Sequence, residues 1–307
     1  MNILGISCFF HDSAAALVQD GIVTVAAEEE RFTRIKYWAG FPKLVIQYCL
    51  NEAGISACDL QHVGISRNPN ANLVRKVLFA VSKRPSMSFL AERLANAGKV
   101  RDPRAAFCEA LNIDPASLKA EFYGIEHHRT HMASAFFVSP FDEAAVLSVD
   151  GAGDFVSTMW GIGRGNQIQV LGEINFPHSL GFVYTAASQW LGFRKYGDEG
   201  KVMGLAPYGR PIHVDTFRRI VRVQRDGTFE LDLDYFVHHA EGASMTFDEG
   251  TPRSARCTRR SSSTRSGLLA NRAARSRSIT RTWRRRSRRC SRRPSSLSFD
   301  GCSARRG

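Results

Sequence analysis

The sequence predicts an α/β fold that contains a duplicated unit of three strands. Residues 3–27 and residues 144–174 share one order of elements: strand, polar turn, strand, hairpin and strand. Stretches with the apolar spacing of helices separate and follow these two segments. The two segments match in pattern and not in residue identity, so the order of elements is what indicates the duplication.

In the first segment, short apolar runs alternate with residues that favour turns. Strands are predicted over residues 3–7, 14–18, 22–27 and 62–66, with a polar turn at residues 10–13 and a hairpin at residues 19–21. A helix is predicted from Pro42 to Ala53, because Pro is favoured in a first helical turn and Gly54 ends the apolar spacing. These elements make up the first unit.

The second segment repeats that order after a helical stretch. Strands are predicted over residues 144–149, 155–162 and 168–174, with a polar turn at residues 150–154. Residues 68–113 have helical spacing and many Lys and Arg, and we interpret them as an insertion or cap over the first unit with a solvated basic face. A helix ending at Ile220 and a hairpin around Asp226-Gly227 are predicted beyond the second unit.

The net charge of +13 is distributed very unevenly along the 307 residues. Residues 251–307 hold 18 of the 42 basic side chains, all of them Arg, and a single acid, Asp300. The first 250 residues therefore carry 24 basic and 28 acidic side chains, a net charge of −4. This balance excludes a basic nucleic-acid-binding domain in residues 1–250.

Residues 251–307 form an Arg/Ser-rich tail without apolar periodicity, which predicts a disordered segment. We interpret the tail as the product of a shifted reading frame. The alternatives are a basic arm that binds nucleic acid or anionic lipid and a phosphorylatable Arg-Ser segment. Translation of the gene beyond codon 251 in the other two frames separates them. An apolar-periodic continuation there would identify the frameshift.

The remaining composition predicts a reduced, cytoplasmic protein. No apolar run approaches the ~18 residues of a membrane span, so no membrane partner is expected. The opening MNILGIS lacks the basic region of a signal peptide. The seven Cys include no C-x-x-C pair.

The segment His127-His128-Arg129-Thr130-His131 is the strongest local indication of chemistry. On a helix, His127 and His131 lie on one face and could share a metal ion, and Asp150 at the end of a strand could add a carboxylate. Two imidazoles and one carboxylate suit iron or another first-row metal with open coordination positions. The open alternative is that these His residues are surface polar groups or hydrogen-bonding core residues.

Two glycine-containing segments could contact phosphate. Gly151 and Gly153 follow a strand, so their backbone could approach an anion closely, although a plain hairpin is the alternative. Residues 196–209 contain five Gly or Pro and are predicted to form a loop rather than a helix. Lys201 in that loop could pair with phosphate or carbamoyl oxygens, and a solvated Lys is the alternative.

Five motifs carry a resemblance to a known family. In order they are HDSAAALVQDG, EEERFTRIK, HHRTHMASAFF, LSVDGAGD and GKVMGLAPYG. They extend over residues 1–250 and resemble the O-carbamoyltransferases of antibiotic biosynthesis and nodulation-factor modification. The first domain of that family is similar to the ATPase that makes threonylcarbamoyladenosine in tRNA. The resemblance therefore implies an incomplete actin, sugar-kinase and heat-shock-ATPase-like fold in residues 1–250.

The resemblance also implies an activity and a set of site residues. Such enzymes make carbamoyl adenylate from carbamoyl phosphate and ATP, and pass the carbamoyl group to a hydroxyl of a small molecule such as a sugar or another secondary metabolite. It implies a metal, iron in the family, at His127, His131 and Asp150. The implied catalytic residues are His11, Asp12 and Lys36, and the implied contacts to nucleotide or carbamoyl adenylate are Gly151, Gly153, Asp198, Lys201 and Gly204.

The resemblance ends after residue 250, where the family continues with further parts of the ATPase-like domain and an adenylate-forming domain. We therefore predict a truncated amino-terminal part of such an enzyme, and a homodimer is one open oligomeric state. One alternative is an ATPase of the tRNA-modification type, although no Glu lies between His127 and His131. The other is a non-enzymatic protein that binds nucleic acid through the tail, with steeply salt-dependent binding.

Overall fold

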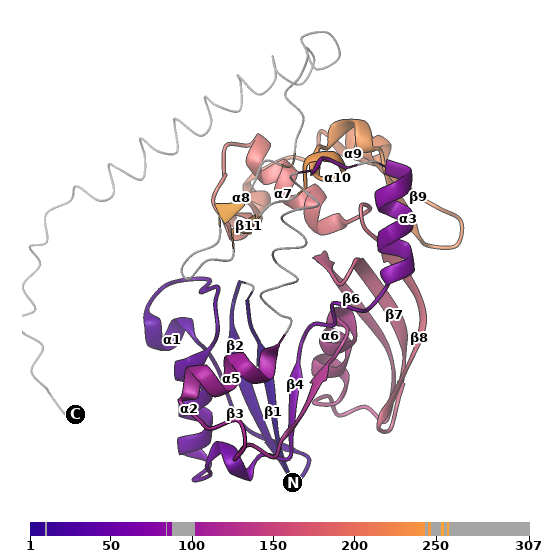
Figure 1. The fold of residues 1–307 in the computed structure, drawn as a ribbon. Helices are drawn as coiled ribbons and strands as arrows, with labels where there is room; N and C mark the ends of the chain where they lie inside the picture. The colour runs from indigo at the N-terminus through magenta and orange to yellow at the C-terminus, as the bar shows by residue number, and fades with distance from the viewer. Residues whose placement is uncertain are drawn as a thin grey trace, which may run out of the picture. The chain divides into compact units, whose positions relative to one another are not determined.

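Two β-sheets, one for each predicted strand segment, organise the fold (Figure 1). The computed structural model describes residues 1–9, 11–83, 85–87, 102–242, 245–246, 253–254 and 257. The described residues all belong to one compact part of the chain, Met1–Arg259. Most of the predicted tail lies outside the described residues, and so does residue 10 of the first predicted turn.

The first sheet has five strands in the order β3-β2-β1-β4-β5. They are β1 (Asn2–Ser7), β2 (Ala14–Gln19), β3 (Ile22–Glu28), β4 (His62–Ile65) and β5 (Glu121–Gly124). The first three strands form an antiparallel meander, whereas β4 pairs in parallel with β1 and β5 in parallel with β4. The predicted strands of the first segment and the mixed α/β class are confirmed.

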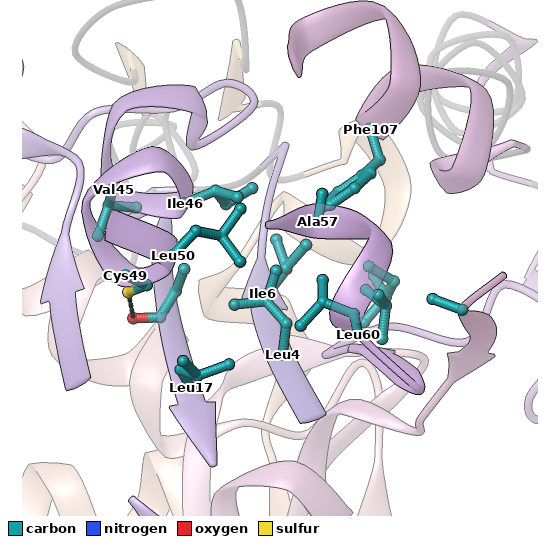
Figure 2. Packing of buried hydrophobic residues seen from close by; sticks show 14 of the residues in the cluster. Leu4, Ile6, Leu17, Val45, Ile46, Cys49, Leu50, Ala57, Leu60 and Phe107 are labelled. Atoms are coloured by element: carbon teal, nitrogen blue, oxygen red, sulfur yellow. Dashed lines mark hydrogen bonds between the residues drawn. The ribbon is translucent and has the colours of Figure 1, made fainter. Parts of the chain in front are cut away.

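Helices cover the β1 side chains that point into the first core. They are α2 (Lys43–Glu52), the short η1 (Ala57–Asp59) and α5 (Pro103–Leu111). Leu4 and Ile6 of β1 pack with apolar side chains of these helices and of β2 in one buried cluster (Figure 2). Burial of each such side chain contributes about 1.5–3 kcal/mol to folding.

Helix α2 receives its N-terminal cap from a residue distant in sequence. Pro42, at the N-cap position, makes no side-chain cap. The buried carboxylate of Glu29 instead accepts hydrogen bonds from the backbone N–H groups of Leu44 and Val45, at 3.1 and 2.8 Å. The negative charge also lies at the positive end of the helix dipole, so Glu29 fixes where α2 begins.

The segment predicted as a helical insertion contains two described helices with different packing. Helix α5 places Phe107 in the core of the first sheet, so it belongs to that core rather than to a cap outside it. Helix α3 (Leu73–Lys83) turns Phe79 toward Phe155 and Phe176 of the second unit. The helical prediction is confirmed over these two ranges, and residues 88–101 lie outside the described residues.

The second sheet repeats the meander of the first. It consists of β6 (Glu143–Gly153), β7 (Val156–Arg164) and β8 (Gln167–Asn175), in that order. Leu147 pairs with Trp160 and Val149 with Thr158, just as Leu4 pairs with Leu17 and Ile6 with Ala15. Both hairpins therefore join paired residues of equal sequence separation, which confirms the predicted duplication.

The remaining elements follow the second sheet. They are α7 (Leu180–Trp190), α8 (Glu199–Leu205), η2 (Ala206–Tyr208), α9 (Val214–Ile220), β9 (Val221–Val223), β10 (Phe229–Leu231), η3 (Leu233–Tyr235), α10 (His238–Glu241), β11 (Met245–Thr246) and β12 (Arg253–Ser254). None of the helices in the described ranges has the length and apolar composition needed to cross a bilayer.

The prediction of a loop at residues 196–209 is wrong over α8 and η2. An added Cβ at Gly200 or Gly204 would meet no neighbouring atom, so these glycines are not required by close packing. Pro207 lies in the first turn of η2, where its missing N–H costs no helical hydrogen bond. Gly200 and Gly204 thus lie within the short helix α8, and Pro207 lies at the start of η2.

The carboxylate of Asp154 joins the first unit, helix α6 (His127–Phe136) and the β6–β7 hairpin. Its Oδ2 accepts hydrogen bonds from the N–H of Asn68 at 2.8 Å and of His127 at 3.0 Å. The Arg67 guanidinium lies 3.9 Å from the other oxygen, and the Asp154 side chain is only 2 % exposed. One buried acid therefore fixes the start of α6 relative to β4 and to the turn.

We expect Asp154→Ala to lower the free energy of unfolding by about 2–4 kcal/mol, because it leaves two partly buried N–H groups without their acceptor. Asp154→Asn retains a carbonyl oxygen and tolerates the positive φ of this position, so it should cost less. Urea denaturation followed by circular dichroism measures both variants, with the exposed Asp215→Ala as control. A loss below 0.5 kcal/mol for the Ala variant, in the range of ordinary surface substitutions, would contradict this role.

His238 of α10 is a fully buried imidazole in the second core. It packs against Phe176, Phe182 and Phe236, and its Nε2–H donates to the carbonyl of Pro177 at 2.8 Å. Burial is the main reason that the pKa of His238 falls to about 4. The folded protein therefore holds this imidazole in its neutral form.

Stability should fall as the pH is lowered from 7 to 5. The unfolded chain binds a proton on this His near pH 6.5, whereas the folded chain does so only near pH 4. The difference removes about 2 kcal/mol between these two pH values. His238→Gln keeps a donor for Pro177 but cannot titrate, so its unfolding free energy should change less with pH. An equal pH dependence in both proteins, measured by urea denaturation, would refute this assignment.

Candidate metal centre

Helix α6 presents His127 and His131 on one face. The carboxylate of Glu126 accepts hydrogen bonds from the N–H groups of His128 and Arg129, at 3.1 and 2.9 Å, and so caps the helix. The Nε2 atoms of His127 and His131 lie 3.0 Å apart. The helix cap and the spacing of four residues thus direct two imidazole nitrogens to one point.

Asp150 of β6 adds a carboxylate to the two imidazoles. Its Oδ2 lies 2.9 Å from Nε2 of His127 and 3.7 Å from Nε2 of His131. The three ligand atoms all lie within 4.8 Å of one another. The structure therefore brings together the three residues that the sequence analysis selected as metal ligands.

The spacing of these atoms fits a common metal ion. Metal–imidazole bonds are about 2.0–2.1 Å long in zinc sites. Two bonds of that length at the right angle of an octahedral site place the nitrogens about 3 Å apart. One carboxylate oxygen and two nitrogens are a donor set that first-row metals accept, with positions left for other ligands. The His131 side chain is half exposed and that of Asp150 partly exposed, so the centre is accessible from solvent.

Asp150 is ionised in this arrangement. Its burial acts to raise the pKa of the carboxyl group. Hydrogen bonds from His127, His131 and the N–H of Gly151 outweigh that effect and hold the pKa of Asp150 well below its usual value. The carboxylate is thus available as an anionic ligand.

His128, between the two candidate ligands, has a structural role. It is fully buried, and its Nε2–H donates to the carbonyl of Val156 at 2.9 Å. Its Nδ1 accepts from the Ser148 hydroxyl at 2.8 Å. Burial and the neighbouring His127 lower the pKa of His128, so it stays neutral and ties α6 to β6 and β7. The alternative of a hydrogen-bonding core His is correct for this residue.

Gly153 is needed because the His127 ring lies against its backbone. A Cβ added at Gly153 would lie 2.0 Å from Cδ2 of His127. A second close approach occurs at Gly151, where a Cβ added at Gly181 of α7 would lie 2.7 Å from the backbone. The hydroxyl of Ser179 donates to the carbonyl of Asp150 at 3.1 Å. The Gly-x-Gly segment therefore serves close packing around Asp150.

The turn of the first unit places His11 and Asp12 together. Nδ1 of His11 lies 2.8 Å from Oδ2 of Asp12, and Asp12 has a positive φ of 58°. The His11 ring lies 4.8 Å from the ring of Tyr196, which in turn lies 5.1 Å from that of Tyr37. An acid and an aromatic side chain thus orient His11.

Tyr196 is the residue that relates this turn to the metal centre, and the sequence analysis did not select it. Burial is the main reason that its pKa is raised, and the negative charges of Asp12 and Asp150 raise it further. The phenol therefore keeps its proton. A Tyr in a glycine-rich segment has no local pattern that distinguishes it, so only the long-range contacts reveal its position.

Of the other predicted site residues, Lys36, Lys201 and Gly204 are exposed, whereas Asp198 is buried. Lys36 lies in an exposed segment after α1 (Glu30–Thr33). The exposed ammonium of Lys201 pairs at 2.5 Å with Asp198, whose other oxygen accepts from the N–H of Lys195 at 2.9 Å. Gly204 is exposed on α8. Their roles in binding nucleotide or carbamoyl adenylate stay predictions.

Comparison with known proteins places the chain among longer relatives. It is 42 % identical over 257 residues to an uncharacterized protein of Synechocystis, with 80 % of this chain and 41 % of the relative covered. It is 33 % identical over 228 residues to the nodulation protein NolNO of Sinorhizobium fredii, covering 74 % of this chain and 32 % of that protein. The chain thus spans less than half the length of these relatives.

A solved structure, YeaZ from Pseudomonas aeruginosa, is similar at 13 % identity with a TM-score of 0.28, over 57 % of this chain and 67 % of that chain. The family described as the carbamoyltransferase N-terminus matches residues 2–250. These residues include both meanders and all three candidate metal ligands. The chain belongs to the carbamoyltransferase N-terminal family.

Proposed function

We propose that residues 1–250 carry the carbamoyl-transfer site of an O-carbamoyltransferase, with a metal ion held by His127, His131 and Asp150. The observation that carries the proposal is the convergence of these three ligand atoms within 4.8 Å in a chain of the carbamoyltransferase family. The curated relatives are longer than the matched region, so the substrates of the whole enzyme are part of the proposal.

The proposed reaction has two stages. In the first stage, water splits carbamoyl phosphate into carbamate and phosphate. A carbamate oxygen then bonds to the α-phosphorus of ATP while the bond to pyrophosphate breaks, which gives carbamoyl adenylate. A hydroxyl oxygen of the acceptor then bonds to the carbamoyl carbon, the bond to the AMP oxygen breaks, and the hydroxyl proton passes to a base. The proposed acceptor is a small molecule such as a sugar, in keeping with the relation to a nodulation protein.

His11 is the proposed base for the acceptor hydroxyl. If its Nδ1–H donates to Asp12, its Nε2 carries the lone pair that can take a proton. The Tyr196 ring restricts the orientation of the imidazole, and Asp12 stabilises the imidazolium that forms.

The metal ligands act on the phosphate side of the reaction. A first-row metal ion, iron by the family resemblance, supplies Lewis acidity toward phosphate oxygens when bound. Within β6, Asp150 is followed directly by the Gly151–Gly153 segment, which brings backbone close to the ligands. We propose that Gly151 and Gly153 contact the adenylate, and that Asp198, Lys201 and Gly204 bind it from α8 while Lys36 helps to neutralise its charge.

Metal binding tests the centre directly. Titration of the purified chain with Fe²⁺ or Co²⁺ in a calorimeter should give one site. His131→Ala removes a ligand, and Gly153→Ala pushes the His127 ring aside, so each should weaken binding at least tenfold. Gly204→Ala is the matched glycine control, because its added Cβ meets no atom, and it should bind as the unchanged protein does. Equal affinity for all four proteins would exclude this centre.

Carbamoyl transfer tests the role of His11 without requiring adenylate formation. Preformed carbamoyl adenylate is supplied with a monosaccharide panel, and the release of AMP and the carbamoylated sugar are measured. His11→Asn should slow transfer by about 10²–10⁴-fold, and Asp12→Asn should slow it less because the imidazole remains. Transfer by His11→Asn at the full rate would overturn the base assignment. No transfer by the unchanged chain would contradict the proposed activity of residues 1–250.

A further inference from the structure

The backbone of Tyr37 is held in a conformation that a bulky side chain disfavours. Its φ of 59° lies in the left-handed region, where a residue of this size is strained. The carboxylate of Glu30 accepts a hydrogen bond from the N–H of Tyr37 at 3.0 Å and helps to hold the backbone there. Strained backbone of this kind is concentrated at binding and catalytic sites, where it places a side chain that function requires.

The segment after Tyr37 is fastened to the turn that carries His11. The carbonyl of Trp38 accepts a hydrogen bond from the N–H of Ser13 at 3.0 Å. The carbonyl of Gly40 accepts another from the buried hydroxyl of Ser13 at 2.8 Å. Because Trp38 follows Tyr37 directly and Ser13 lies two residues after His11, these bonds fix the place of Tyr37 relative to His11.

The phenol ring of Tyr37 lies against a glycine of a distant segment. A Cβ added at Gly197 would lie 2.2 Å from the hydroxyl oxygen of Tyr37 and 2.3 Å from the ring carbon that carries it. The φ of Gly197, 77°, also disfavours every residue with a Cβ. Any other residue at position 197 would therefore displace the phenol of Tyr37.

This close approach brings the ring of Tyr196 into contact with both Tyr37 and His11. The centroids of the Tyr37 and Tyr196 rings lie 5.1 Å apart at 81°, which is the edge-to-face arrangement that aromatic pairs favour. The Tyr196 ring lies 4.8 Å from the imidazole of His11 at 38°. A series of ring contacts thus extends from Tyr37 through Tyr196 to His11.

We propose that Tyr37 and Gly197 are positioning residues for the transfer step. The phenol of Tyr37, held against Gly197, keeps the Tyr196 ring against His11 and so fixes the direction in which Nε2 takes the proton of the acceptor hydroxyl. The inference rests on the proposed function, in which His11 is that base. Both residues act through Tyr196, so their loss should slow transfer more than it weakens acceptor binding.

Transfer kinetics with preformed carbamoyl adenylate and a monosaccharide acceptor test this role. Tyr37→Leu removes the ring, and Gly197→Ala displaces the phenol. Each should lower kcat by about 10–100-fold and leave the KM for the sugar within about twofold. Tyr37→Phe retains the ring and should recover most of the rate lost in Tyr37→Leu. Full transfer by both Tyr37→Leu and Gly197→Ala would overturn the proposal.

Gly192→Ala is the matched control for Gly197→Ala. Gly192 also has a positive φ, of 96°, but its added Cβ meets no atom. This variant therefore carries the backbone strain without the displaced phenol, and it should transfer at nearly the rate of the unchanged chain. Equal losses of kcat in the Gly192 and Gly197 variants would overturn the role of the Tyr37 contact.

The NMR signal of the imidazole Cε1–H of His11 gives a readout that requires no activity. It is assigned by its absence in His11→Asn, and the neighbouring Tyr196 ring shifts it through its ring current. The shift should be lost in Tyr37→Leu and Gly197→Ala and kept in Gly192→Ala. An unchanged shift in the first two variants would overturn the proposal.

The two readouts separate this inference from the proposed function. No transfer by the unchanged chain, with the NMR shifts as expected, would overturn the base assignment and support the positioning of His11. Circular dichroism and the thermal midpoint of each variant check folding. Tyr37→Asn replaces Tyr37→Leu if the latter does not fold, because Asn tolerates the left-handed φ and also lacks the ring.

Discussion

The position of α6 against the β6–β7 hairpin is the constraint on which the candidate centre depends. A metal site tolerates errors of only a fraction of an ångström in its ligands. Here one helix carries two ligands and one strand the third, so their relative position must be fixed by contacts outside the site. Asp154 fixes the first N–H of the helix, His128 ties its buried side to two strands, and Gly153 admits the His127 ring.

These contacts explain why the sequence HHRTH has two kinds of His in it. His127 and His131 point to the carboxylate of Asp150, while His128 points into the protein and meets a hydroxyl and a carbonyl. A helical turn of 3.6 residues separates neighbouring side chains by about 100°, so adjacent His residues necessarily serve different surroundings. The ligand pair and the scaffold residue are thus both consequences of one helical segment.

Much of the fold could be predicted from the sequence, because its signals are local. The strands of both meanders have short apolar runs bounded by turn residues, and the ligand pair has the spacing of one helical face. What could not be predicted depends on contacts between distant residues. Nothing local marks Glu29 as the cap of α2, Tyr196 as the neighbour of His11, or Phe107 as part of the first core.

The turn between the first two strands has a different role in each of the two duplicated segments. His11 follows Leu4 at the same interval as Asp154 follows Leu147, so the two residues occupy equivalent places in their hairpins. His11 is partly exposed beside Asp12 and Tyr196, whereas Asp154 is buried and holds backbone N–H groups. One copy of the turn presents a titratable side chain, and the other uses the same place to hold the molecule together.

The buried carboxylate that caps α2, Glu29, belongs to the EEERF motif. Within three consecutive acids, Glu29 holds the N–H groups of Leu44 and Val45, and Glu30 accepts from the N–H of Tyr37 at 3.0 Å. Part of this motif therefore serves folding rather than catalysis, because the carboxylates of Glu29 and Glu30 hold backbone N–H groups. Loss of activity after a change at Glu29 would report a misplaced helix, and yield or melting behaviour would reveal it before any assay of turnover.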